Sequence, residues 1–316
     1  MDQGARPRQQ GASGDPSRLS TRIPDYKKTP SPIFTEQREI GNYSIDNEGK
    51  FHHDARQLRK YVPPEDNKNV RFDVTSGTED AIQRDETDNR EKYKTFLQWI
   101  VEDKNRFLME KPAKTHGSRP KGNGRFHSLS PDFVCTRGLV SRVLCVPYEN
   151  NNVLELSVIK FRGTYFLCEG DYPFTGEANV WGYRFEQYVT ADKGTGIPDL
   201  SRPINTNERF YSVVRSQLGQ HSLVCRGEVD CVDVNQEEGN RYVELKIKKI
   251  REDPRGDVNF LRYKLLQWWA QSVSGGVPVV VCGYYSKEND VEAMVKKTKT
   301  YKVKDMPQKA QVNVGF

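Results

Sequence analysis

The sequence has no hydrophobic run long enough to cross a bilayer, since a membrane-spanning helix needs about 20 apolar residues. Its first stretch, MDQGARPRQQGASGDPSRLSTRIPDYKKTPSP, also lacks the apolar segment of a secretory signal. Pro, Gly, Ser, Gln and Arg dominate this stretch, so we predict that residues 1–32 form a disordered tail. We therefore expect no membrane association and no secretion.

Cysteine and histidine are few and scattered. The six cysteines lie mostly inside apolar segments and form no CxxC pair. The five histidines include the neighbours His52 and His53, but the chain has no HExxH motif and no finger-like Cys/His spacing. These absences argue against a zinc site, and they predict buried free thiols in a reducing compartment.

Neither sign of charge is in large excess. The 316 residues include 49 Lys and Arg against 43 Asp and Glu, with a formal net charge of +6. This balance permits an anionic partner but does not require one. A hydrophobic content of 35% suits one large domain or two small ones. We treat residues 33–316 as a single domain.

Helical and strand patterns alternate irregularly along this domain, which predicts a mixed α/β or α+β fold. Helices are expected over residues 75–110, 131–149, 179–191 and 257–276. Strands are expected over residues 151–170 (two strands that turn at Arg162–Gly163), 241–250 and 277–286. Residues 207–234 hold a helix or strand followed by a strand, and the basic segment 291–308 is an edge strand or a tail.

The strand RYVELKIKKI (241–250) alternates apolar and charged residues. Successive side chains point to opposite faces, so Glu244, Lys246 and Lys248 share one face. A solvated face is the more common meaning of this pattern. The preceding segment changes that interpretation, because Glu228 and Asp230 are two residues apart in GEVDCVDV and are expected to share one strand face. If the two segments are adjacent strands, three carboxylates and one ammonium form a single patch.

Crowded carboxylates repel one another, and a divalent cation removes that penalty. Mg²⁺ prefers oxygen ligands and binds phosphate oxygens, which is the chemistry of metal-dependent phosphodiester hydrolysis. An acid, a strand and then E-x-K is the arrangement of the PD-(D/E)XK nuclease core. E-x-K alone is a weak signal, but E-x-D followed by E-x-K is more specific.

Three further segments support this interpretation. GYRFE (182–186) places Glu186 behind Gly, Tyr and Phe, and FVCTRGL sets Arg137 beside Gly138. In LRYKLLQWWAQS the residues Lys264, Trp268 and Gln271 have the spacing of one helical face.

Together these motifs resemble the decapping exoribonuclease (DXO) family of RNA 5′-end quality control. The order G-Φ-x-Φ-E, E-Φ-D and E-Φ-K, with an upstream Arg and a downstream KLLxWWAQS helix, is the signature of that family. The segments IDNEGKFHHDARQLRKYVPP, FRGTYFL, WGYRFEQYVTADK and NTNERFYSVVRSQLG are also similar to family text. The resemblance runs from about residue 39 to residue 286.

The resemblance implies a role for each matching residue. The implied metal ligands are Glu186, Glu228, Asp230, Glu244 and the carbonyl of Leu245. Lys246 would contact the scissile phosphate or the attacking water, and Gln271 would position that water or a phosphate oxygen. The implied substrate contacts are Glu91, Thr136, Arg137 and Gly138, together with Glu228, Lys246 and Gln271.

The family also implies a fold and an activity. The implied fold is a twisted mixed β-sheet flanked by helices, with a PD-(D/E)XK-like core and two Mg²⁺ or Mn²⁺ ions in a cleft. The implied substrates are RNAs with non-standard 5′ ends: triphosphate, incompletely methylated cap or NAD cap, followed in many members by 5′→3′ degradation. A nuclear 5′→3′ exoribonuclease is a candidate partner, and the expected location is the nucleus, the cytoplasm or both.

Other interpretations of single residues stay open. Glu186 and Gln271 could be solvated helix residues, Glu228 and Asp230 could simply flank a loop, and Arg137 could be a structural ion-pair partner. Trp268 and Trp269 are expected in the core. The basic segments 111–130 and 296–309 could contact RNA phosphates, although a solvated surface is the favoured interpretation.

Two departures from the family pattern affect the expectation. Family chains usually continue well beyond VVVCGYYS, so we expect a missing C-terminal part, which puts stable folding in question. The family often has a substrate-facing Arg near Gly49–Lys50, and this sequence does not. The rival functions are a catalytically weak RNA-end binder or exoribonuclease adaptor, and a DNA nuclease with the same core. The retained acids favour the enzyme, and the accessory motifs disfavour the DNA nuclease.

Overall fold

The computed structural model describes residues 30, 32–35, 37–84, 91–110, 127–148, 154–169, 180–191, 195–236, 239–251, 253–288 and 292–310. Nearly all of the predicted tail 1–32 and most of the basic loop 111–130 lie outside these residues, so both predictions stay untested. Among the described helices, none is long and apolar enough to cross a membrane.

Seven strands form the first sheet in the order β2-β1-β11-β12-β7-β9-β8. Their bounds are Arg38–Ile45 (β1), Phe51–His52 (β2), Phe133–Thr136 (β7), Leu156–Phe161 (β8), Thr164–Glu169 (β9), Arg209–Leu218 (β11) and His221–Glu228 (β12). The sheet is mixed, because β7 runs parallel to both of its neighbours while the other pairs are antiparallel.

The second sheet also has seven strands, in the order β10-β3-β13-β14-β15-β16-β4. Their bounds are Arg59–Tyr61 (β3), Phe72–Asp73 (β4), Thr190–Ala191 (β10), Cys231–Val232 (β13), Tyr242–Lys249 (β14), Val279–Lys287 (β15) and Ala293–Lys302 (β16). It is mixed as well, with parallel pairs β13–β3 and β14–β15. A separate small hairpin joins β5 (Leu108–Glu110) to β6 (His127–Leu129).

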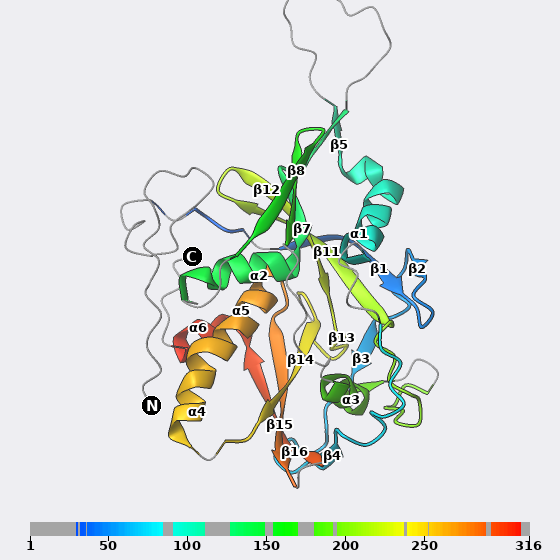
Figure 1. Ribbon diagram of the computed structural model, residues 1–316, viewed down its shortest axis with the longest axis vertical. Coiled ribbons are helices and arrows are strands. Elements are labelled where there is room, and N and C mark those ends of the chain that lie inside the picture. Colours follow the sequence, from blue (N-terminus) through cyan, green and yellow to red (C-terminus); the bar gives the residue numbers. More distant parts are fainter. Residues whose placement is uncertain are drawn as a thin grey trace, which may run out of the picture.

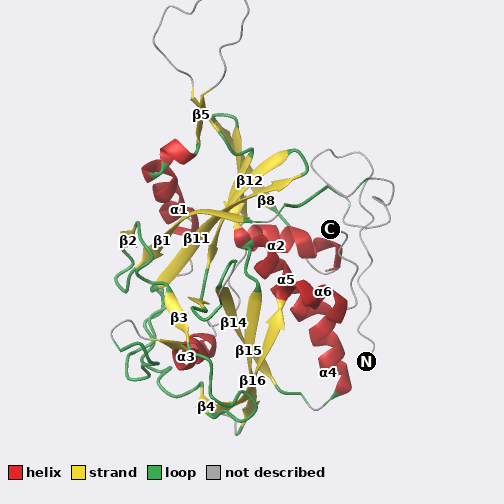
Figure 2. Cartoon of the chain, turned by 180° about the vertical axis from the view of Figure 1, so that it is seen from behind, coloured by secondary structure: helices red, strands yellow, loops and turns green. Residues whose placement is uncertain are grey.

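Helices cover both faces of each sheet (Figures 1 and 2). They are α1 (Glu91–Glu102), α2 (Arg137–Cys145), α3 (Val180–Val189), α4 (Pro254–Asn259), α5 (Leu265–Ser274) and α6 (Met306–Lys309), with a π-helical segment Phe260–Lys264 between α4 and α5 and 3₁₀ turns at Lys104–Arg106, Val146–Tyr148 and Val303–Asp305. Separate apolar clusters join α1 and α2 to the first sheet. Two more join α3 and α5 to opposite faces of the second sheet.

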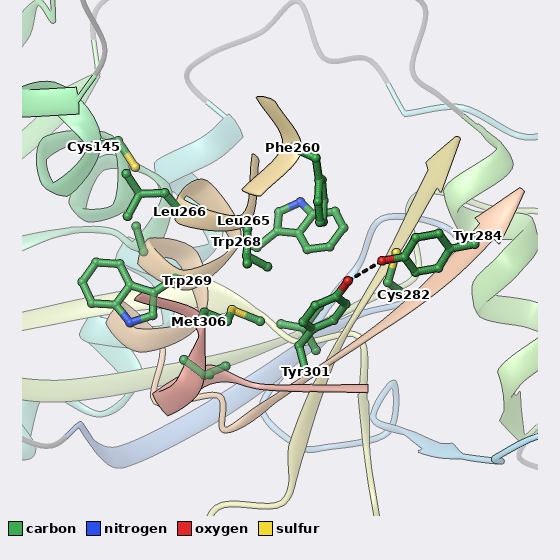
Figure 3. Packing of buried hydrophobic residues seen from close by; sticks show 13 residues of the cluster. Cys145, Phe260, Leu265, Leu266, Trp268, Trp269, Cys282, Tyr284, Tyr301 and Met306 are labelled. Atoms are coloured by element: carbon green, nitrogen blue, oxygen red, sulfur yellow. Dashed lines mark hydrogen bonds between the residues drawn. The ribbon is translucent and has the colours of Figure 1, made fainter. Parts of the chain in front are cut away.

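The alternation in β14 explains its place in the second sheet. Val243 and Leu245 are buried against Phe185 and Val189 of α3. On the other face of the sheet, side chains of β15 and β16 pack against α5, as Figure 3 shows for Trp268, Tyr284 and Tyr301. Each face of the strand therefore meets a different helix, and Glu244, Lys246 and Lys248 of β14 lie on the α5 face.

The mixed fold and most of the expected elements are confirmed. The helix expected over 75–110 is shorter, because α1 begins at Glu91. The region 131–149 begins with strand β7 before α2, and the first element of 207–234 is strand β11. The basic segment 291–308 contains strand β16, which lies between β15 and the short β4. The six cysteines are free thiols, and Trp268 and Trp269 are core residues, as expected.

Candidate active site

The acidic residues meet where the chain passes from the first sheet to the second. Glu228 ends β12 of the first sheet, and Asp230 lies in the short connection to β13 of the second sheet. The expectation that Glu228 and Asp230 share one strand face is therefore wrong. The chain changes sheets between them, and β13 then pairs antiparallel with β14, which carries Glu244.

Glu244 is the most deeply buried of these acids, with 1% of its surface exposed. Its Oε1 accepts hydrogen bonds from Lys246 Nζ at 2.6 Å and from Gln271 Nε2 of α5 at 2.7 Å. Its Oε2 accepts from Arg137 Nη1 of α2 at 3.0 Å. Burial favours a neutral carboxyl, but the Arg137 and Lys246 charges outweigh it and hold the pKa of Glu244 below its usual value. Glu244 is therefore an anion that gathers three donors from three elements.

Asp230 and Glu186 are in the opposite situation. Asp230 Oδ2 accepts one hydrogen bond from the Leu245 N–H at 2.6 Å. Burial, followed by repulsion from Glu244 and Glu186, raises the pKa of Asp230 well above its usual value. Burial also raises the pKa of Glu186 to about 7, assisted by nearby carboxylates. Both carboxyls are thus buried beside other acids, and both conditions disfavour their charged forms.

Lys246 and Arg137 supply the positive charge that the site does have. Burial opposes the charge of each, but neighbouring carboxylates, with Glu244 first among them, raise the pKa of both. Arg137 is 5% exposed and is enclosed by two glycines. A Cβ atom at Gly227 or at Gly275 would lie 2.7 or 2.8 Å from Arg137 Cδ. The chain therefore needs glycine at both positions to bring the guanidinium to Glu244.

Glu186, Glu228 and Asp230 line one open pocket. Two arginines near these acids were missed from the sequence. Arg59 lines the pocket, and its Nη2 lies 2.8 Å from Glu208 Oε2. Its positive charge partly offsets the rise in the pKa of Glu186. Arg84 Nη1 lies 3.9 Å from Glu228 Oε2. Arg59 lies in HHDARQLRKY, which we matched to family text without assigning any single residue.

The structure distributes the other expected site residues differently. The Thr136 hydroxyl caps α2 by accepting from the Leu139 N–H at 3.3 Å, and Gly138 is exposed next to it. Glu91 is the first residue of α1, but its side chain lies outside the described part of the chain. Lys264 is exposed and Trp268 is buried, so only Gln271 of the expected helical face reaches the acids.

The donor set is chemically suited to a hard divalent cation. Four carboxyls and the Leu245 carbonyl are oxygen donors of the kind that Mg²⁺ and Mn²⁺ bind. Burial, with repulsion between neighbouring carboxylates, raises the pKa of Asp230 and Glu186, and a bound cation would offset both effects. Within the described ranges, however, no three acidic, histidine or cysteine side chains converge on one metal position. Glu244 is instead occupied by its three donors.

Comparison with known proteins adds an independent line of evidence. Residues 35–314 match the family model described as "RAI1 like PD-(D/E)XK nuclease". The chain is 35% identical over 283 residues to the decapping and exoribonuclease protein of Rattus norvegicus, covering 85% of this chain and 68% of that one. It is also 35% identical over 280 residues to the Homo sapiens protein of the same name, covering 84% and 67%. The chain thus spans about two thirds of the length of these relatives.

Solved structures agree on the fold. Scheffersomyces stipitis Rai1, in complex with (3′-NADP)+ and calcium ion, gives a TM-score of 0.70 at 21% identity, covering 94% of this chain and 81% of that one. Candida albicans Rai1, in complex with pU5-Mn²⁺, gives a TM-score of 0.68 at 22% identity, covering 90% and 77%.

Proposed function

This chain belongs to the RAI1-like PD-(D/E)XK nuclease family, and from that premise we propose that it is a metal-dependent hydrolase of RNA 5′ ends. The observation that carries the proposal is the meeting of Glu186, Glu228, Asp230 and Glu244 beside Lys246 at the junction of the two sheets. A binder or adaptor without catalysis needs no such concentration of acids, which is costly to bury.

Each residue has a proposed role. Glu186, Glu228, Asp230, Glu244 and the Leu245 carbonyl hold divalent metal, Mg²⁺ or Mn²⁺. When bound, such ions polarise a phosphate and lower the pKa of water. Lys246 keeps its proton, because Glu244 and Asp230 stabilise the ammonium, and it donates to a phosphate oxygen. Gln271 orients water or phosphate from α5. Arg137 holds Glu244 in place, and its predicted contact with the RNA backbone is an additional role.

The proposed substrates are RNAs with 5′-triphosphate, incompletely methylated or NAD-capped ends. The support is that the curated relatives are named decapping and exoribonuclease proteins, and that structural neighbours were crystallised with pU5-Mn²⁺ and with (3′-NADP)+. We extend the proposal to 5′→3′ degradation after end removal, to two metal ions, and to a role in RNA quality control in the nucleus, the cytoplasm or both. A nuclear 5′→3′ exoribonuclease is the proposed protein partner.

The test compares four RNAs that differ only at the 5′ end: triphosphate, GpppN cap, NAD cap and monophosphate. Each is incubated with the purified protein in Mg²⁺, in Mn²⁺ or in EDTA. We expect metal-dependent release that the double variant Glu228→Ala, Asp230→Ala reduces by more than about 100-fold, since losing even the partners of metal ligands can cost 10–100-fold. The preferred end then defines the substrate.

The matched control is Glu65→Ala, Asp66→Ala, which removes two exposed carboxylates from a surface turn and should leave the rate unchanged. If no product is released from any RNA while folding and RNA binding stay intact, the adaptor function is favoured over the hydrolase. Equal cleavage of single-stranded DNA would favour the DNA nuclease instead.

A further inference from the structure

A cluster of lysines surrounds two tyrosines on the α5 side of the second sheet. Tyr284 of β15 and Tyr301 of β16 are both buried, and their hydroxyls are hydrogen-bonded to each other (Figure 3). Four ammonium groups lie against the two rings. The Nζ-to-centroid distances are 5.2 Å for Lys248 and 5.3 Å for Lys297 at Tyr284, and 5.0 Å for Lys299 and 5.5 Å for Lys309 at Tyr301.

Sheet register explains why these side chains gather. Lys248 of β14 is opposite Tyr284 of β15, which is opposite Lys297 of β16. Lys246 is likewise opposite Cys282, which is opposite Lys299. Residues directly opposite one another point to the same face, so two rows of lysines cross the sheet. One of those rows begins at Lys246, next to Glu244.

The aromatic rings restrict the lysine stems. Lys248 Nζ also lies 4.3 Å from the centre of the Phe260 ring, and only 11% of its side chain is exposed. A cation over an aromatic face is attracted to the ring. Lys297, Lys299 and Lys309 are exposed residues. The cluster is thus a fixed array of charges with an apolar base.

The charges in this cluster do not cancel. Asp257 of α4 accepts from Lys248 at 2.8 Å. Lys248 lowers the pKa of Asp257, and the charges of Lys297 and Lys299 contribute. One carboxylate therefore faces the ammonium groups of Lys248, Lys297 and Lys299, and these charges leave an excess of positive charge on the surface. A concentrated field of one sign attracts polyanions.

We propose that this lysine–tyrosine cluster (Lys248, Lys297, Lys299 and Lys309 around Tyr284 and Tyr301) binds phosphates of the RNA chain beyond its reacting 5′ end. The assignment to RNA rests on the proposed function and on continuity with the site. Lys246 and Lys248 lie on one strand face, and at the usual rise of a strand their Cα atoms are about 6.7 Å apart. Helix α5 covers the sheet between Lys246 and Lys299, where Cys282 is fully buried, so later phosphates of an RNA held at Lys246 would reach the exposed lysines of the cluster from outside this helix.

The chemistry also defines the kind of contact. Both tyrosine rings are buried, so they cannot stack on bases. Ammonium groups contact phosphates as point charges, without discriminating between bases. The cluster should therefore increase affinity for long RNA regardless of sequence, and it should not affect the chemical step on a very short RNA.

The test measures binding of a fluorescein-labelled 20-nucleotide RNA with a 5′-hydroxyl by anisotropy, in EDTA, from 50 to 200 mM KCl. The variant is Lys297→Ala, Lys299→Ala, Lys309→Ala. Each single-strand phosphate contact contributes about 0.7 to the slope of log K against log salt. The variant should lose about 2 from that slope and bind about 10- to 100-fold more weakly at 0.1 M salt.

Two controls separate charge from structure. Lys68→Ala, Lys104→Ala, Lys160→Ala removes three exposed lysines elsewhere and should leave the slope unchanged. Replacing Lys297, Lys299 and Lys309 by Arg retains the charge and should retain binding. An unchanged slope and affinity in the Ala variant would overturn the proposal, as would loss of binding to an acidic peptide with RNA binding intact.

The assay also distinguishes this proposal from the proposed function. Binding is measured without metal, so it does not depend on catalysis. A slope change in a protein that hydrolyses no RNA would support the cluster and refute the enzyme. Conversely, normal hydrolysis of a 5′-triphosphate dinucleotide by the Ala variant, with weaker binding of the 20-nucleotide RNA, supports both.

Discussion

The Arg137–Glu244 pair is the residue-scale feature on which the site depends. Only 6% and 2% of these two side chains are exposed, at a nitrogen–oxygen distance of 3.0 Å. Arg137 begins α2 on the first sheet, and Glu244 belongs to β14 of the second. The pair therefore links the two sheets, and it fixes one carboxylate that Lys246 and Gln271 also contact. A buried pair of this kind specifies geometry more than it adds stability.

Replacing Arg137 by Gln should destabilise the protein strongly. The change leaves the Glu244 carboxylate buried without one of its two compensating charges, and breaking a buried pair costs about 3–5 kcal/mol. Urea denaturation measures the change. The control is Arg142→Gln in the same helix, where a half-exposed guanidinium lies 3.7 Å from Glu169 and the expected loss is about 0–1 kcal/mol. Equal losses of unfolding free energy in the two variants would show that the buried Arg137–Glu244 pair matters no more than an exposed pair.

Helix α3 is the element that positions Glu186. Its neighbour in sequence, Phe185, is fully buried and packs against the second sheet beside Gly283 of β15. A Cβ at Gly283 would lie 2.7 Å from Phe185 Cε2. The close approach of strand and helix is thus set by a glycine on the strand. Glu186, the next residue of the helix, lines the same pocket as Glu228.

Gly283→Ala should push α3 away from the sheet. Overpacking of this size costs about 1–3 kcal/mol, and the shift of Glu186 should lower RNA 5′-end hydrolysis at temperatures where the variant is still folded. Gly182→Ala in α3 is the matched comparison, because nothing lies within 4 Å of the added Cβ. It should stabilise the helix by about 0.5–1 kcal/mol. Unchanged kinetics in folded Gly283→Ala protein would show that the position of α3 does not matter for catalysis.

At the scale of the whole molecule, apolar packing stabilises the fold, and charged contacts position the side chains of the site. Four apolar clusters lie between helices and sheets. Side chains of α2 and α5 meet through Ser141 and Ser274, whose hydroxyls are 3.2 Å apart. None of these contacts needs a metal ion. That residues 33–316 form a single domain stays a prediction.

Divalent metal should raise the thermal stability of the wild-type protein without being required for folding. A ligand that binds only the native state at 100 times its Kd adds about 2.7 kcal/mol. Calorimetry with Mn²⁺ should show an increase in Tm for the wild type and none for Glu228→Ala, Asp230→Ala. EDTA should return the Tm to its metal-free value. Unfolding of the wild type by EDTA would contradict this and would make the metal structural.

Local patterns in the sequence were sufficient for most of the elements, and they predicted that Glu244 and Lys246 share one strand face, where the structure joins them by a hydrogen bond. The alternation of β14, the helix around GYRFE and the spacing of Glu244 and Lys246 depend on residues a few positions apart, so periodicity encodes them. The same pattern predicted the apolar face of β14 that packs against α3.

Only the tertiary structure decided how these parts meet. The chain changes sheets between Glu228 and Cys231, which a period-2 pattern cannot show. Three features of the site join residues that are far apart in the chain. They are the ion pair between Arg137 and Glu244, the approach of Arg59 and Arg84 to the acids, and the rows of lysines across the second sheet. Such contacts depend on which elements pack together. That choice is made by burial of the whole apolar surface, not by any local sequence signal.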